Sequence, residues 1–310
     1  MMSFVLLAIV IMLLGLFGLV LWSYLFRETR VGEIRALGGD EDTLDPASEL
    51  FSETVELFTN TQLYSGNRIE LLLNGDGTYP RLFDQLRRAE KLITWFVFWY
   101  RQGDLADQVK KILSERAEAG VKVLFLYDWY GTDLPREYFD SLRAAGVEVA
   151  PFRPPKLTTL FKIQQRMHVR AVTIDSRIGF TGGFSIDDNW KGGGRREGEW
   201  RDTSVQVEGP IVDQLQAAFA MNWAEASKQL LVGRSLFDPS NQSRGQQEAA
   251  LVHNAPSMGS TNADRLYALA IRSARHRIWF TTAYFVPEDD FHSHLLEAAR
   301  DGVDVRILHP

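Results

Sequence analysis

The chain opens with a long uninterrupted run of apolar residues. Residues 4–21 carry no charge. Only glycine interrupts this run of apolar side chains such as Val, Leu, Ile and Phe. A helix needs about 20 such residues to cross a bilayer. Trp22 and Tyr24 follow at the place where an interfacial aromatic belt would lie. The pattern predicts a membrane-spanning anchor over residues 1–26.

A cleaved signal peptide is the alternative explanation of this run. It would carry Lys or Arg before the apolar stretch, a shorter apolar core and a small-residue cleavage site, and none of these is evident. Positive charge lies only on the C-terminal flank, at Arg27, Arg30 and Arg35. Because positively charged flanks tend to stay in the cytoplasm, we expect an uncleaved, single-pass protein of the cell inner (cytoplasmic) membrane. Its soluble domain would face the cytoplasm.

After the anchor, the pattern changes from one apolar run to alternating strands and helices. Residues 27–60 are expected to be a polar linker, since they include the acidic stretch 38–48. Beyond it, buried-strand patterns alternate with amphipathic helices; they cover 68–73, 79–90, 91–100, 105–119 and 121–127. Strands separated by helices of this length predict an α/β fold, with a mixed or parallel sheet covered on both faces.

The chain also repeats part of itself. Residues 89–100 match 274–285, and residues 119–126 match 301–308 at nearly the same offset. A helix pattern lies between the two matches in each copy. The sequence therefore predicts a duplicated α/β lobe, whose second copy is incomplete at Pro310.

Charge and cysteine content exclude several classes of function. The formal net charge of −6 argues against a protein that coats nucleic acid, so we expect no nucleic-acid partner. The absence of cysteine excludes disulfides, thiol nucleophiles and cysteine-ligated metals.

The most specific chemical signal lies in the middle of the chain. His168 and Arg170 stand two residues apart in a strand-like run, so their side chains should project to one face about 7 Å apart. Apolar residues over 172–174 and 178–180, around the turn signal 175–177, predict a β-hairpin. The expected pair of cationic side chains would hold one anion.

A surface pair of His and Arg is the common alternative. The full pattern is much rarer, because Asp175 follows Arg170 at a fixed spacing and Gly182 and Gly183 come after it. We therefore interpret the segment as a metal-free phosphodiester site.

This segment resembles the HKD motif of the phospholipase D superfamily, particularly its bacterial cardiolipin synthase branch. Further landmarks of that branch occur along residues 60–310; they are 66–67, 75–77, 127–129, 199–203, 208–210, 219 and 222–223. The resemblance implies a phospholipase D-like lobe over 61–230, a connector over 231–262 and a partial second lobe over 263–310. It implies no metal or organic cofactor.

The resemblance also implies an activity, namely phosphatidyl transfer between two phosphatidylglycerol molecules through a phospho-histidine. His168 would be the nucleophile or acid/base, Arg170 the phosphate clamp and Asp175 a supporting acid. Gly182, Gly183 and Ser185 would bind the phosphate, with a helix starting near Ser185 that turns N–H groups toward it. Two positions depart from the family pattern: Arg170 replaces its lysine and Ser185 its asparagine.

The family reaction uses two imidazoles, one as nucleophile and one as acid, and this sequence carries the motif once. We expect the 310 residues to be a fragment or shortened copy of a longer enzyme. A homodimer that pairs two copies of His168 is a possibility that we do not favour. The sequence is also compatible with a phosphodiesterase that hydrolyses lipid or nucleic acid, and with an inactive remnant.

Overall fold

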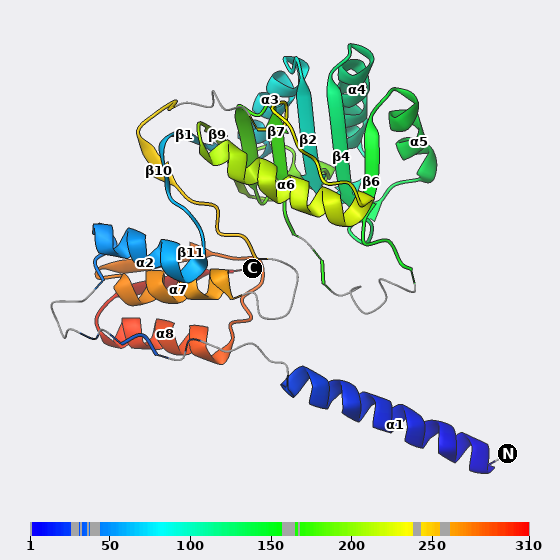
Figure 1. Cartoon of the computed structure of the whole chain (residues 1–310). Coiled ribbons are helices and arrows are strands. Elements are labelled where there is room, and N and C mark those ends of the chain that lie inside the picture. Colours follow the sequence, from blue (N-terminus) through cyan, green and yellow to red (C-terminus); the bar gives the residue numbers. More distant parts are fainter. Residues whose placement is uncertain are drawn as a thin grey trace. The chain divides into compact units, whose positions relative to one another are not determined.

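The computed structural model describes residues 2–25, 31, 33–35, 37, 44–156, 165–166, 168–237, 243–254 and 261–309 (Figure 1). The chain divides into two compact units. The central unit is Gln62–Leu251, and the terminal unit joins Met1–Thr61 to Val252–Pro310.

The central unit is built on a mixed sheet of eight strands in the order β10-β1-β9-β8-β7-β2-β4-β6. Strands β2, β4 and β6 are parallel, and β7, β8, β9, β1 and β10 continue the sheet in antiparallel pairs. In chain order they are β1 (Tyr64–Leu73), β2 (Leu92–Val97), β4 (Lys122–Asp128), β6 (Glu148–Phe152), β7 (Ala171–Ile174), β8 (Ile178–Gly182), β9 (Thr203–Glu208) and β10 (Gln247–Ala249). The short strands β3 (Tyr100–Arg101) and β5 (Thr132–Asp133) pair separately.

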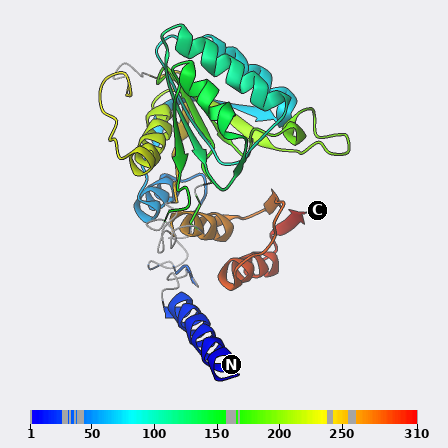
Figure 2. The same cartoon turned by 90° about the vertical axis from the view of Figure 1, so that its right-hand side faces the viewer.

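Helices cover both faces of this sheet, as the sequence predicted. Helices α3 (Asn74–Arg87), α4 (Asp104–Glu118) and α5 (Arg136–Ala144) cover one face, and α6 (Ile211–Ser227) covers the other. Figure 2 shows α6 in yellow-green and the helices α3 and α4 in blue-green on opposite sides of the strands.

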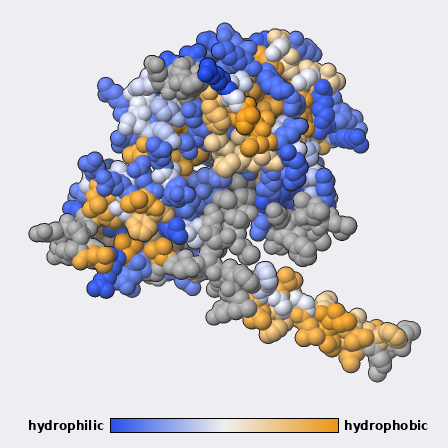
Figure 3. Space-filling model, viewed as in Figure 1, coloured by the Kyte–Doolittle hydropathy of each residue, from blue (hydrophilic) through white to orange (hydrophobic). Residues whose placement is uncertain are grey.

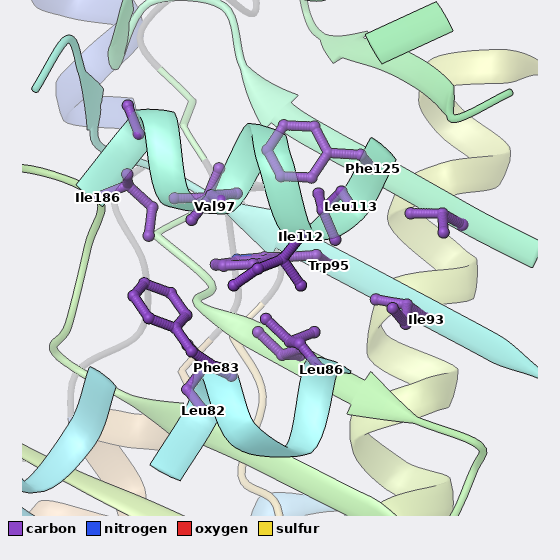
Figure 4. Packing of buried hydrophobic residues seen from close by; sticks show 14 of the residues in the cluster. Leu82, Phe83, Leu86, Ile93, Trp95, Val97, Ile112, Leu113, Phe125 and Ile186 are labelled. Atoms are coloured by element: carbon purple, nitrogen blue, oxygen red, sulfur yellow. The ribbon is translucent and has the colours of Figure 1, made fainter. Parts of the chain in front are cut away.

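The larger part of the core lies between the sheet and the helices α3 and α4. Leu82 and Leu86 of α3 and Leu113 of α4 have no exposed surface, and they close on Trp95 and Phe125 of the sheet (Figure 4). Burying side chains of this size stabilises the fold by about 1.5–3 kcal/mol each. The strands β2 and β4, which lead to the candidate site, are therefore held by fully buried side chains on this face.

The start of α3 differs from the prediction, which began this helix only at residue 79. Asn74 has a φ of 56°, a conformation that Asn tolerates, and the helix begins there. The N–H of Asn74 donates to the Asp202 carbonyl at 2.8 Å, and the N–H of Asp76 donates to the Gly192 carbonyl at 3.0 Å. These distant carbonyls satisfy first-turn donors that a helix leaves unpaired.

The terminal unit begins with α1 (Met2–Leu25). Among the described residues it is the one helix long and apolar enough to cross a membrane, with a mean hydropathy of 3.1 over Phe4–Trp22. The side chains of residues 4–22 are exposed all round, and Figure 3 shows this stretch as an apolar rod. Arg27 and Arg30, on which the predicted orientation depends, lie outside the described residues.

Residues 27–60 are more than the polar linker that the sequence predicted. They contain α2 (Glu49–Thr59), whose first turn is capped by Ser48, since the Ser48 hydroxyl accepts from the N–H of Phe51 at 3.1 Å. The apolar positions of α2 recur at helical spacing, and the helix packs on α7 (Asn262–Ser273).

The rest of the terminal unit is a smaller copy of the first elements of the central unit. After α7 come β11 (Arg277–Thr281), α8 (Asp289–Arg300) and β12 (Asp304–Leu308), and the two strands are parallel. This is the order of α3, β2, α4 and β4, whose strands are also parallel neighbours. The internal repeat seen in the sequence is therefore a repeat of structure.

Candidate functional site

His168 lies at the edge of the sheet where β2 ends and β7 begins. Phe96 of β2 is paired with Ala171 of β7, so the residue before β7 and the residue after β2 meet. The His168 ring rests on Phe98, with ring centroids 3.8 Å apart at an interplanar angle of 45°. His168 as a whole is exposed to solvent, so it is accessible to a substrate.

Arg170 shares this aromatic support. Its guanidinium carbon lies 5.7 Å from the centroid of the Phe98 ring, within cation–π range. Nε donates to the Ser185 hydroxyl at 2.8 Å, and one terminal nitrogen donates to the His168 carbonyl at 3.2 Å. Because both side chains contact one ring, they lie on the same side of the chain.

The surroundings of His168 lower its pKa and so favour the neutral form of the ring. Burial against Phe98 lowers the pKa of His168 below its usual value of about 6.5, and the positive charge of Arg170 lowers it further. Burial also lowers the pKa of Arg170, while the Asp202 carboxylate acts in the opposite direction. The arrangement thus offers an uncharged imidazole nitrogen beside a cation.

Asp175 lies at the far end of β7 from His168. Its carboxylate accepts the backbone N–H groups of Glu90, Lys91 and Leu92 at 3.0, 2.7 and 2.9 Å. Asp175 and Ser176 have φ values of 52° and 54°, which a tight hairpin turn between β7 and β8 requires. These contacts tie the predicted hairpin to the start of β2, so the geometry gives Asp175 a structural task.

Gly182, the last residue of β8, and Gly183 after it are needed for close packing on the segment at the start of β9. A Cβ on Gly182, which has a φ of 145°, would lie 2.6 Å from the Ser204 Cα. A Cβ on Gly183 would lie 2.4 Å from a carboxylate oxygen of Asp202. This glycine pair therefore lets the Asp202 carboxylate lie against the backbone beside Arg170.

Asp202 is the residue near the motif whose place sequence reasoning missed. Its carboxylate accepts from the indole N–H of Trp190 at 2.8 Å, and its backbone is bonded in both directions to Asn74. The sequence pointed to it only as part of the landmark 199–203. Its position beside Arg170 depends on the pairing of β8 with β9, more than 30 residues after His168.

The prediction of a helix starting near Ser185 is wrong. Ser185 lies in a loop, and the first helical turn is a short 3₁₀ segment at Asp188–Trp190. The adjacent Ile186 is used in a bridge to the chain after β2: its N–H donates to the Trp99 carbonyl, and its carbonyl accepts from the N–H of Arg101. Ser185 itself is fully buried between Arg170 and the hydroxyl of Tyr79, which donates to its carbonyl at 2.6 Å.

A buried ion pair supports the chain just before His168. Arg166 and Asp128, at the end of β4, approach to 3.6 Å with side chains 8% and 0% exposed. Arg166 also donates to the Arg153 carbonyl at 3.0 Å. The Arg153 guanidinium in turn forms a bidentate ion pair with the Glu225 carboxylate, with distances of 2.6 and 3.0 Å. The segment that enters the motif is therefore held from two sides. Among the described residues, no three His, Asp or Glu side chains gather as a metal site.

Comparison with known proteins shows to which family the chain belongs. No family model matches the sequence. The chain is 37% identical to a cardiolipin synthase of Geobacillus kaustophilus over 243 residues, which are 77% of this chain and 48% of that protein. It is 33% identical to a cardiolipin synthase of Alkalihalophilus pseudofirmus over 287 residues, which are 92% of this chain and 56% of that protein. The chain belongs to the phospholipase D superfamily, as a cardiolipin synthase-like member.

A solved structure supports the same fold. The phosphatidylserine synthase of Haemophilus influenzae aligns with 84% of this chain and 65% of its own, with a TM-score of 0.56 and 12% identity. At that identity the likeness concerns the fold alone. The cardiolipin synthase-like chain spans about half the length of the curated relatives that it matches.

Proposed function

We propose that this chain carries one catalytic half of a phosphatidyltransferase of the cardiolipin synthase type. The observation that carries the proposal is the accessible His168 imidazole beside the Arg170 guanidinium, both supported by Phe98. The similarity to cardiolipin synthases over most of the chain supports a phospholipid substrate. Helix α1 would keep that substrate within reach, in the cell inner membrane.

In the proposed reaction, a ring nitrogen of His168 attacks the phosphorus of phosphatidylglycerol. The bond from phosphorus to the glycerol oxygen breaks, the phosphatidyl group stays on His168, and glycerol leaves after taking a proton from an acid. Arg170 neutralises the charge that builds on the non-bridging oxygens. A hydroxyl of a second phosphatidylglycerol then gives its proton to the group that protonated glycerol and attacks the phosphorus. The bond from phosphorus to the His168 nitrogen breaks, which forms cardiolipin and restores both His168 and the acid.

The acid in this scheme is a second imidazole. The sequence carries the His-x-Arg-x4-Asp pattern once, so the proposal requires a second motif or a second copy of the chain. Asp175 supports the hairpin in this proposal and does not touch the substrate, because its carboxylate is occupied by three backbone N–H groups.

The test is product analysis by mass spectrometry after incubation of the full chain with phosphatidylglycerol in mixed micelles. At a protein concentration that lets two copies of the chain supply the two imidazoles, we expect cardiolipin and glycerol from the wild type, loss of both with His168→Ala, and retention with His276→Ala, a matched change at an exposed histidine. Phosphatidic acid as the product in place of cardiolipin would instead indicate a phosphodiesterase that hydrolyses the lipid. Equal product from wild type and His168→Ala would overturn the role of His168.

A further inference from the structure

An open groove lies beside the candidate site, along the same edge of the central sheet. It has a volume of about 870 Å³ and is formed by the end of β4, the loop after it, α5 and the end of β6. None of the motif residues lines it. The groove is therefore a separate feature of the edge at which parallel strands of an α/β sheet present ligands.

The groove has aromatic walls. Tyr127 stacks on Phe139 at its base, with ring centroids 4.1 Å apart and nearly parallel planes. Trp129 and Tyr130 line it from the loop after β4, and they are 42% and 68% exposed. Exposed tryptophan and tyrosine side by side are typical of surfaces that meet the polar region of a membrane.

The groove is also positively charged. Arg136, Arg143 and Lys156 line it together with one acid, Asp140. Asp140 is shared between the two arginines, at 3.4 Å from Arg136 and 2.9 Å from Arg143. Three cations against one carboxylate leave the lining with an excess of two positive charges, which suits an anionic ligand.

The loop that forms the groove also supports the candidate site. A Cβ on Gly131 would lie 2.1 Å from the carbonyl oxygen of Phe98, the residue on which the His168 ring rests. The guanidinium carbon of Arg166 lies 5.4 Å from the centroid of the Tyr130 ring. Arg166 precedes His168 by two residues. A ligand in the groove would thus lie next to the reacting edge.

We propose that this groove binds the glycerophosphate headgroup of an anionic phospholipid, as the second lipid molecule of the transfer reaction. The inference rests on the proposed function, because it assigns the groove to the acceptor lipid of that reaction. The cations would hold the phosphate, and Trp129 and Tyr130 would lie at the level of the headgroups. The groove itself takes no part in bond making.

The experiment measures lipid binding without turnover, in the His168→Ala background. The full chain is placed in nanodiscs of phosphatidylcholine that contain a phosphatidylglycerol with a photoreactive headgroup, and labelled peptides are identified by mass spectrometry. We expect labelling of the tryptic peptide 123–136, which contains the loop after β4, and none from a phosphatidylcholine that carries the same photoreactive group. Glycerol 3-phosphate at millimolar concentration, as a soluble competitor, would abolish labelling if the groove bound the free phosphate ester instead.

The variant with Arg136→Gln and Lys156→Gln should lower labelling of this loop by about fivefold for each cation removed. The matched control is Arg88→Gln with Lys111→Gln, which removes two exposed, ion-paired cations from outside the groove and should leave labelling unchanged. Equal labelling in both double variants, or labelling confined to other peptides, would overturn the assignment of the groove as a lipid-binding site. That result would leave the product assay with His168 untouched, so the two proposals can fail separately.

Discussion

At the level of single residues, the site is a small set of contacts around one phenylalanine. His168 and Arg170 both lie against Phe98, and the Ser185 hydroxyl holds the Arg170 Nε. Arginine offers a planar fork that can bind two phosphate oxygens and stays charged at any physiological pH, whereas lysine is a compact point charge. The Ser185 contact uses one donor of that fork and leaves Arg170 with further donors for a ligand.

The first prediction concerns the charge state of His168. Burial and the nearby Arg170 both lower its pKa, so the ring should stay neutral to a lower pH than a free histidine. If neutral His168 is the nucleophile, activity should fall only as the pH drops through this lowered pKa. Replacing Arg170→Gln removes a like charge and should move the pKa up toward its usual value.

Proton NMR of the His168 ring, assigned with His168→Ala, measures this titration directly. Arg177→Gln, at the exposed turn of the same hairpin, is the matched control and should leave the midpoint where it is. A His168 midpoint above the usual histidine value in the wild type would contradict the described burial and charge.

At the level of elements, the β7–β8 hairpin brings the motif to the sheet edge. Its two strands pair in register from Ala171 with Thr181 to Ile174 with Ile178. Asp175 anchors the turn to the start of β2, and the Asp128–Arg166 ion pair anchors the entry to the motif. Because breaking a buried ion pair leaves an uncompensated charge, this entry is expected to tolerate changes at Asp128 or Arg166 poorly.

The second prediction tests the structural task of Asp175. Asp175→Ala leaves three backbone N–H groups without their acceptor, so the free energy of unfolding should fall by about 2 kcal/mol. Asp175→Asn keeps one oxygen acceptor and should lose less. Urea unfolding measures both, with exposed Glu118→Ala as the control. An unchanged stability for Asp175→Ala would show that its carboxylate is not a structural anchor.

At the level of the whole molecule, the chain combines an apolar helix long enough to cross a membrane, an α/β lobe and a second, smaller copy of the first elements of that lobe. The lobe contains the candidate site and the groove, and the terminal unit contains α1 and the repeated strands β11 and β12. The exposed face of β11 and β12 carries Arg277, Trp279 and Arg306, with both guanidiniums over the indole ring. The matching face of the central sheet carries Leu92 and Leu124 beneath α6, so the two copies have diverged most on this side.

The third prediction concerns α1. Its exposed apolar surface should keep the full chain in the membrane fraction during alkaline carbonate extraction, because about 20 apolar residues make a stable bilayer span. A variant that lacks residues 2–25 should move to the soluble fraction. A control deletion of α2 should remain with the membrane. Release of the full chain by carbonate would contradict an integral anchor.

Local patterns along the chain were sufficient to predict its N-terminal apolar helix, its α/β alternation, its repeat and the His168–Arg170 motif. These features depend on neighbours a few residues apart, so hydropathy and spacing reveal them. The support of both side chains by Phe98, the approach of Asp202 to Arg170 and the loop at Ser185 could not be read in that way. They arise from strand pairing: β2 pairs with β7 across 75 to 81 positions of the sequence, and β8 pairs with β9 across 22 to 30 positions. A one-dimensional pattern does not contain that pairing, because the register of distant strands is set by how the whole core packs.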